Sequence, residues 1–100
     1  PWVGNEKGFA GATNWSFLRT GEVFPGYEKY RTLQYGHADG DQWVAAECDV
    51  SIRPGWFYHP EEDNQVKNVD QLTDLYYRSV GHNATLLLNF PIDRNGLIHP

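Results

Sequence analysis

Apolar residues in this chain gather in short blocks that are separated by long polar stretches rich in glycine. Trp2 and Val3 precede a polar Gly-Asn-Glu stretch, as at the end of a buried strand that runs into a loop. The segment 42–52 (QWVAAECDVSI) has the apolar and β-branched content of a second strand. The segment 84–90 (ATLLLNF) is a continuous apolar run, which predicts a strand buried on both faces, as in a parallel sheet.

Between these last two segments, residues 69–80 carry the pattern of an amphipathic helix. Asn68 is its predicted N-cap and Gly81 its predicted C′ residue. The order strand, helix, strand predicts an α/β fold. Residues 7–41 show no sustained period and residues 60–67 are acidic and polar, so both are predicted to be loops. The buried stripe of the helix is predicted to contain Val69, Leu72, Leu75 or Tyr76, and Val80.

Both ends of the sequence are expected to be cuts within one longer domain. The chain opens inside an apolar stretch without an initiator Met, and Ile98-His99-Pro100 closes it without a stop signal. We therefore expect residues 1–100 to form part of a single domain, incomplete in this chain.

Composition narrows the possible partners. The formal net charge is −5, from 8 basic and 13 acidic residues, and no basic cluster is present, which argues against nucleic acid or an anionic membrane surface. No apolar run approaches the roughly 18 residues of a membrane span. Aromatic residues make up 15% of the chain, an excess that suits sugar faces or peptide grooves. The single cysteine, Cys48, and the isolated histidines give no metal-ligand spacing, so neither a metal nor another cofactor is predicted.

Three carboxylates are the candidates for chemistry. Glu6 follows a predicted strand end, where enzymes with parallel sheets place reactive groups, although a solvated loop carboxylate is the alternative. Glu47 and Asp49 have the same parity and would share one face of an extended strand. They either pair with a buried base such as Arg53 or line a site.

The four rings of Trp56, Phe57, Tyr58 and His59 follow directly after Gly55. Core packing explains Phe57 best, whereas Trp56 at the mouth of a strand is suited to stack on a sugar. Carboxylates on separate strand ends together with stacking aromatics are what glycoside hydrolysis requires, because one acid protonates the leaving oxygen while a second attacks or activates water.

Three ordered stretches of the chain strongly resemble the α-L-fucosidases of glycoside hydrolase family 29, in particular the branch that cleaves α-1,3/4-linked fucose. They are residues 2–15 (WVGNEKGFAGATNW), 46–63 (AECDVSIRPGWFYHPEED) and 72–98 (LTDLYYRSVGHNATLLLNFPIDRNGLI). The resemblance covers nearly the whole chain and leaves only residues from about 17 to 41 unassigned.

The resemblance implies a fold and a mechanism. The family's catalytic domain is a (β/α)8-like, TIM-type barrel, of which this chain would be a C-terminal portion. The family's catalytic domain hydrolyses terminal α-L-fucose with retention through a covalent fucosyl-enzyme intermediate. The nucleophile of the family is an Asp in a Phe-Asp-Gly type motif. That motif does not occur in this sequence. The nucleophile is therefore expected upstream, and the isolated 100 residues are expected to be inactive.

By the same resemblance, Glu6 of the Gly-Asn-Glu motif is the general acid/base, and Glu47 is the second candidate. If Glu6 is the acid, Glu47 would bind sugar hydroxyls. We expect both carboxylates to meet in one pocket at the carboxyl end of a parallel sheet, with Trp56 on its wall. Further substrate-binding candidates are Asn5, Asp49 and Arg53, with Arg53 expected to anchor Glu47 or Asp49.

Two rival functions stay open at this point. A non-catalytic carbohydrate-binding module would also explain the aromatics and acids, but such modules are usually antiparallel β-sandwiches, so the predicted helix and buried strand count against it. An interaction or structural fragment without a sugar site is the other. The resemblance implies a fucosylated oligosaccharide as substrate and a secreted, periplasmic or lysosome-like location. It gives no oligomeric state.

Overall fold

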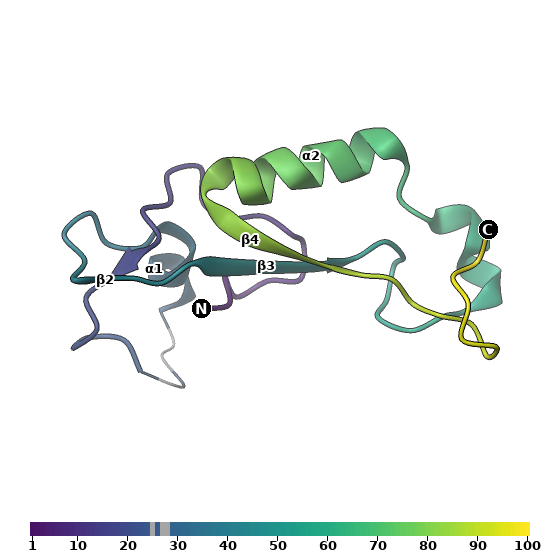
Figure 1. The fold of residues 1–100 in the computed structure, drawn as a ribbon, viewed down its shortest axis with the longest axis horizontal. Coiled ribbons are helices and arrows are strands. Elements are labelled where there is room, and N and C mark those ends of the chain that lie inside the picture. Colours follow the sequence, from purple (N-terminus) through teal and green to yellow (C-terminus); the bar gives the residue numbers. More distant parts are fainter. Residues whose placement is uncertain (25, 27–28) are drawn as a thin grey trace.

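A computed structural model describes residues 1–24, 26 and 29–100 of the chain. Two parallel strands, β3 (Ala46–Ser51) and β4 (Ala84–Asn89), are joined through helix α2 (Val69–Ser79), and Figure 1 shows α2 running alongside this pair. The first residues add a third parallel segment, since Trp2 bridges Glu47 and the Val3 amide donates to the Glu47 carbonyl at 3.0 Å. The predicted α/β order is therefore confirmed.

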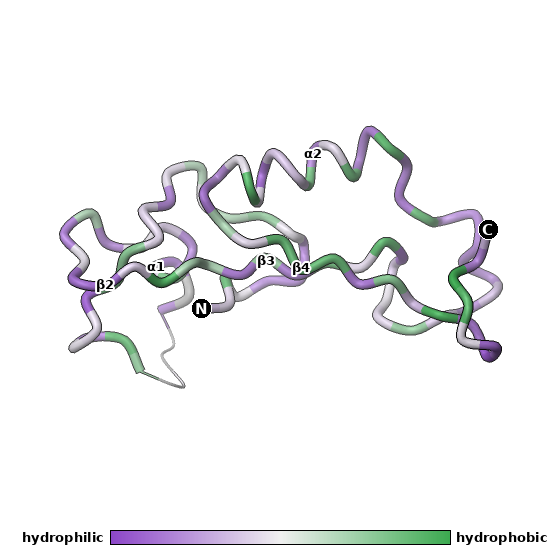
Figure 2. The backbone as a smooth tube through the Cα atoms, viewed as in Figure 1, coloured by the Kyte–Doolittle hydropathy of each residue, from purple (hydrophilic) through white to green (hydrophobic). Residues whose placement is uncertain are grey.

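The core lies between α2 and one face of the sheet. Val3 and Cys48 are fully buried there, and Val50 and Leu75 close the layer at 3% and 4% exposure. Side chains alternate along β3, so that Ala46, Cys48 and Val50 face this core. In Figure 2 the tube alternates between green and purple along β3, is mostly green along β4, and is mostly purple or white along α2, because α2 contributes only a narrow apolar stripe.

Helix α2 begins where the sequence predicts. The Asn68 side chain accepts from the Gln71 amide at 2.9 Å, and the Gln71 side chain accepts from the Asn68 amide at 2.9 Å, a capping box that satisfies two donors at the helix start. The predicted end is confirmed in position, because α2 ends at Ser79 with Val80 as its C-cap and Gly81 next to it as C′. Gly81 is not left-handed, however: the 3-10 turn η2 (Val80–His82) continues the chain, and the left-handed residue is Asn83 at φ 60°.

The apolar stripe of α2 is narrower than predicted. Leu75 is buried and Leu72 is half-buried, but Val69 is 76% exposed and Val80 is 40% exposed. The segment 8–10 packs against α2 where further apolar side chains of the helix would otherwise lie. Its contact with α2 includes a hydrogen bond from the Ala10 amide to the Arg78 carbonyl at 3.0 Å. Backbone rather than a second row of side chains therefore covers this side of α2.

Three other sequence predictions need correction. The strand expected over 42–52 is broken into β2 (Gln42–Trp43) and β3, because β2 pairs antiparallel with β1 (Phe17–Leu18) instead of continuing the sheet. Strand β4 is not buried on both faces, since Leu87 is 51% exposed on the face away from α2. Residues 60–67 contain a 3-10 helix, η1 (Pro60–Gln65), rather than an open loop.

The segment 7–41 is mostly irregular, as predicted, but it contains β1 and the short helix α1 (Tyr30–Tyr35). The prediction is not tested at Pro25, Tyr27 and Glu28, which lie outside the described residues. Together α1, β1 and β2 form a small group at the amino end of β3 (Figure 1). Within the described part of the chain, no helix combines the length and the apolar character that crossing a lipid bilayer requires.

The molecule is elongated. Its principal extents are 46 × 27 × 18 Å and its radius of gyration is 15.6 Å, against roughly 13 Å for a compact domain of this length. The sheet face opposite α2 carries Trp2 and Leu87, which are 47% and 51% exposed. The molecule therefore has two distinct ends along the strand direction. One end holds the loops after the parallel strands, and the other holds β1, β2 and α1.

Candidate active site

Glu6 is presented by a short turn directly after the first parallel segment. Gly4 has φ 83° and Gly8 has φ 79°, conformations in which glycine is favoured, so the chain bends sharply on both sides of Glu6. The Asn5 side chain accepts from the Lys7 amide at 2.9 Å and donates to the Phe9 carbonyl at 3.4 Å. In this structure Asn5 thus shapes the turn that carries the exposed Glu6 carboxylate.

Trp56 lies against Glu6 and, as predicted, on the wall of a cavity that Glu6 also lines. Its indole Nε1 donates a hydrogen bond of 2.8 Å to Glu6 Oε2. The two residues come from loops that follow neighbouring parallel segments, and both loops lie at the carboxyl end of the sheet. This is the end at which parallel α/β folds assemble their sites from several loops.

A small cavity of about 230 Å³ opens beside this contact. Its wall includes Glu6, Trp56 and Arg53, together with Ser51 and Lys67. A second groove of about 430 Å³ shares Glu6 and Lys67 with the cavity and continues along the first half of α2. The Glu6 carboxylate and Lys67 therefore lie where the two spaces meet, while the Trp56 indole lines the smaller one.

Arg53 is buried and paired, but not with the predicted partner. Its side chain is 2% exposed, and Nη2 lies 2.7 Å from Asp63 Oδ1 in η1. Nη1 donates to the His59 carbonyl at 3.3 Å, and the guanidinium sits 4.6 Å from the centre of the Tyr58 ring. The expectation that Arg53 anchors Glu47 or Asp49 is therefore wrong. Arg53 instead closes the loop that carries Trp56.

Tyr58 responds to the same group of charges. Partial burial raises the pKa of its phenol, and the neighbouring Asp63 carboxylate raises it further, while Arg53 opposes the shift. Tyr58 therefore stays a neutral hydrogen-bond donor, and its hydroxyl donates to Asp63 Oδ2 at 3.4 Å.

Glu47 and Asp49 share one face of β3, as their parity predicts. This is the face away from α2, where Asp49 accepts a hydrogen bond from the Trp2 indole and Glu47 is exposed. The predicted meeting of Glu47 with Glu6 is wrong in position, because Glu47 is the second residue of β3, level with Trp2 and Thr85. It does not line the cavity beside Glu6.

The sequence did not single out Asn89, Ser51, Lys67 and Asp63. Asn89 ends β4, and its Nδ2 donates to Ser51 Oγ at 3.1 Å and to the Trp56 carbonyl at 3.0 Å. Lys67 Nζ donates to the Ser51 carbonyl at 2.7 Å. A signal for Asn89 is present in the sequence, because it is the first polar residue after the apolar run of β4.

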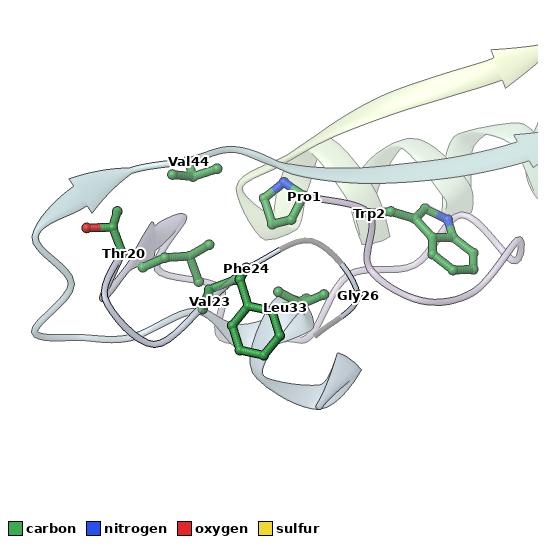
Figure 3. A pocket seen from close by; sticks show the side chains of 9 residues that line it. Pro1, Trp2, Thr20, Val23, Phe24, Gly26, Leu33 and Val44 are labelled. Atoms are coloured by element: carbon green, nitrogen blue, oxygen red, sulfur yellow. The ribbon is translucent and has the colours of Figure 1, made fainter. Parts of the chain in front are cut away.

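A larger cavity lies at the opposite end of the sheet. The volume of this cavity is about 550 Å³. Figure 3 shows its apolar lining, which includes Trp2, Leu33 and Val44. Among the described residues its lining offers no carboxylate, imidazole or basic side chain. Elsewhere in the described ranges, no three His, Cys, Asp or Glu side chains are grouped so as to hold a metal ion. Of these two cavities, the one beside Glu6 is the better suited to acid/base chemistry.

Comparison with known proteins finds clear similarity to a segment of larger enzymes. The chain is 50% identical over 102 aligned residues to α-L-fucosidase 1 of Arabidopsis thaliana, covering 97% of this chain and 19% of that protein. It is 54% identical to a glycoside hydrolase 29 family member from an unknown rumen bacterium, with a TM-score of 0.86 over 99% of this chain and 17% of that one.

A third relative was solved with a sugar. It is a Ruminococcus gnavus glycoside hydrolase family 29 fucosidase in complex with fucose, 38% identical, with a TM-score of 0.79 over 98% of this chain and 20% of that chain. The chain thus spans about a fifth of the length of the relatives it matches. No family model matches it.

Proposed function

We propose that this chain is a segment of the catalytic domain of a retaining α-L-fucosidase and that it supplies the general acid/base, Glu6. The similarity to α-L-fucosidases over 97% of the chain supports the enzyme class. The observation that carries the site is the 2.8 Å hydrogen bond from Trp56 Nε1 to Glu6 Oε2 at the carboxyl end of the parallel segments. A TIM-type barrel around this segment is part of the proposal.

The contact divides the two oxygens of Glu6 between two tasks. The indole donates to Oε2, so Oε1 is left to hold the proton that the leaving oxygen receives. After that transfer the carboxylate is ionised, and the indole hydrogen bond stabilises the charge. Glu6 then removes a proton from the water that hydrolyses the fucosyl-enzyme intermediate.

The nucleophile of this mechanism is an Asp outside the 100 residues. In retaining enzymes the two carboxyl groups stand roughly 5–5.5 Å apart, so the Asp would face the cavity beside Glu6. We expect the isolated segment to show no turnover of an aryl fucoside for lack of this group. Turnover by the purified segment would contradict the assignment of the nucleophile to another part of the protein.

The substrate we propose is a terminal α-1,3- or α-1,4-linked fucose on an oligosaccharide or glycoconjugate. The groove along α2 offers Gln71, Asp74 and Lys7 beside Glu6, polar groups suited to the hydroxyls of the sugar that leaves. Comparing the release of fucose from α-1,2-, α-1,3- and α-1,4-linked oligosaccharides tests this preference. Faster release from the α-1,2 isomer would refute it.

The non-catalytic binding module is the weaker alternative. Strands β3 and β4 are parallel and joined through a helix, whereas such modules are usually antiparallel sandwiches. We also propose an extracytoplasmic location, on the resemblance alone. Cell fractionation with an antibody to the protein tests this, and a purely cytoplasmic signal would contradict it.

Azide rescue tests the acid/base in the full-length protein that carries this segment. Glu6→Ala should slow a fucosyl disaccharide by at least about 100-fold and an activated aryl fucoside far less, because only the poor leaving group needs a proton. Azide should restore turnover and yield fucosyl azide. Glu47→Ala is the matched control, and rescue of that variant but not of Glu6→Ala would reverse the two roles.

A further inference from the structure

We propose that Asn89 is a positioning residue for Glu6 that acts through Trp56. The inference rests on the proposed function, since it assigns Glu6 as the acid/base. It concerns three residues that the fold brings together from distant points of the sequence: the end of β4, the loop after β3 and the turn after the first parallel segment.

The Asn89 amide uses both of its donors. Nδ2 donates to Ser51 Oγ at 3.1 Å and to the Trp56 carbonyl at 3.0 Å. A carbonyl oxygen can only accept, so the Trp56 contact fixes which end of the amide faces the loop. An aspartate here would place a second acceptor against that carbonyl, which makes the amide the fitting group.

Trp56 passes this constraint on to Glu6. With its carbonyl held by Asn89, the half-buried Trp56 donates its indole Nε1 hydrogen to Glu6 Oε2 at 2.8 Å. A hydrogen bond weakens steeply as its donor angle closes, so a modest rotation of the Trp56 peptide would release the carboxylate. The orientation of Glu6 therefore depends on Asn89 through Trp56, which contacts both side chains.

The loop itself does not need Asn89 in order to fold. Arg53 holds the Asp63 carboxylate at 2.7 Å and the His59 carbonyl at 3.3 Å, and the Lys67 amide donates to the Ile52 carbonyl at 2.8 Å. None of these three anchors involves Asn89, so we expect them to persist when Asn89 is changed. The expected effect is therefore on the orientation of Trp56 and Glu6 rather than on the presence of the loop.

The kinetic test uses Asn89→Ala in the full-length protein. A misdirected Glu6 would lose part of the roughly 10²–10⁴-fold that a positioned acid contributes, so we expect kcat for a fucosyl disaccharide to fall by about 10-fold. An activated aryl fucoside should lose less than about 2-fold, because its leaving group needs no proton. Gln42→Ala, which removes an exposed amide from β2, is the matched control and should change neither substrate.

A double-variant comparison separates positioning from general damage. Trp56→Phe keeps a ring but removes the indole donor, so adding Asn89→Ala should cost less than about 2-fold more with the disaccharide. Ser51→Ala frees one Asn89 donor and is the second variant should Asn89→Ala fold poorly. Losses that multiply, or equal losses with both substrates, would overturn the proposal.

A spectroscopic readout tests the same contact without turnover. In protein labelled with 15N-tryptophan, the Trp56 indole resonance, identified by its absence from Trp56→Phe, should shift in both Asn89→Ala and Glu6→Gln but not in Gln42→Ala. An unmoved resonance in Asn89→Ala would overturn the inference. Wild-type protein that turns over no fucoside but shows these shifts would instead count against the proposed function alone.

Discussion

Removing the carboxylate of Asp63 should destabilise the protein more than removing its cationic partner. The Arg53 side chain is 2% exposed, whereas the Asp63 side chain is 30% exposed, and the two are joined at 2.7 Å. Asp63→Asn leaves a guanidinium without a counter-charge in a place that water hardly reaches. Arg53→Met instead removes the buried charge, fills a similar volume and leaves a carboxylate that water can reach.

The magnitudes follow from this difference in burial. Breaking a buried pair by removing one partner costs roughly 3–5 kcal/mol when the remaining charge is fully enclosed. Asparagine can still accept one hydrogen bond from Arg53, so we expect a loss of about 2–3 kcal/mol for Asp63→Asn. For Arg53→Met we expect about 1 kcal/mol, because Asp63 keeps water and the nearby His99, whose Nε2 lies 3.2 Å away.

Urea unfolding of the full-length protein, followed by tryptophan fluorescence, measures both variants. Arg53→Met combined with Asp63→Asn should lie close to Arg53→Met alone, because no unpaired buried charge remains. Asp74→Asn is the control, since it breaks the exposed 3.5 Å pair with Arg78 and should cost less than about 0.5 kcal/mol. A larger loss in Arg53→Met than in Asp63→Asn would refute the argument from burial.

Two further predictions concern the core and the helix. Burial raises the pKa of the Cys48 thiol to about 11 from an ordinary 9.0, and the neighbouring Asp49 and Glu47 carboxylates add to the shift. A thiol reagent at pH 8 should therefore label the buried Cys48 only after the protein is unfolded. Mass spectrometry measures this labelling, and a labelled Cys48 peptide from the native protein would contradict the prediction. Asn68→Ala removes the capping box of α2 and should lower the free energy of unfolding by about 1 kcal/mol, measured by urea denaturation, with the exposed Asn64→Ala unchanged as control.

The sequence predicted correctly those elements whose stabilising contacts lie between residues close together in the chain. Helix α2 begins at the predicted residue because Asn68 and Gln71 carry the capping signal within one turn. The predicted strand over 42–52 failed at its first half because Trp43 pairs with Phe17, a partner 26 positions away that no pattern within 42–52 reveals. Pairing between distant segments thus decided where β3 begins.

The candidate site was predicted in part for the same reason. A strand end followed by a polar turn located Glu6, and an aromatic after a strand located Trp56, and the two side chains meet. The parity of Glu47 gave its face correctly, but parity carries no information about position along a strand. Arg53 pairs with Asp63, which η1 brings close to it. This partner was not predicted, because the sequence indicated only a loop over these residues.

Two neighbouring positions of the turn are constrained for unrelated reasons. At position 6 the proposed catalytic role requires a carboxylate, whereas at position 8 the lack of space for a side chain requires glycine. At φ 79°, a Cβ on Gly8 would lie 2.8 Å from both Leu75 Cδ2 and Val50 Cγ1. Across homologous sequences both positions should therefore resist change equally, and invariance at Gly8 would record the closeness of the backbone to α2 and say nothing about catalysis. Only the loss of activity in a stable variant separates an invariant catalyst from an invariant spacer.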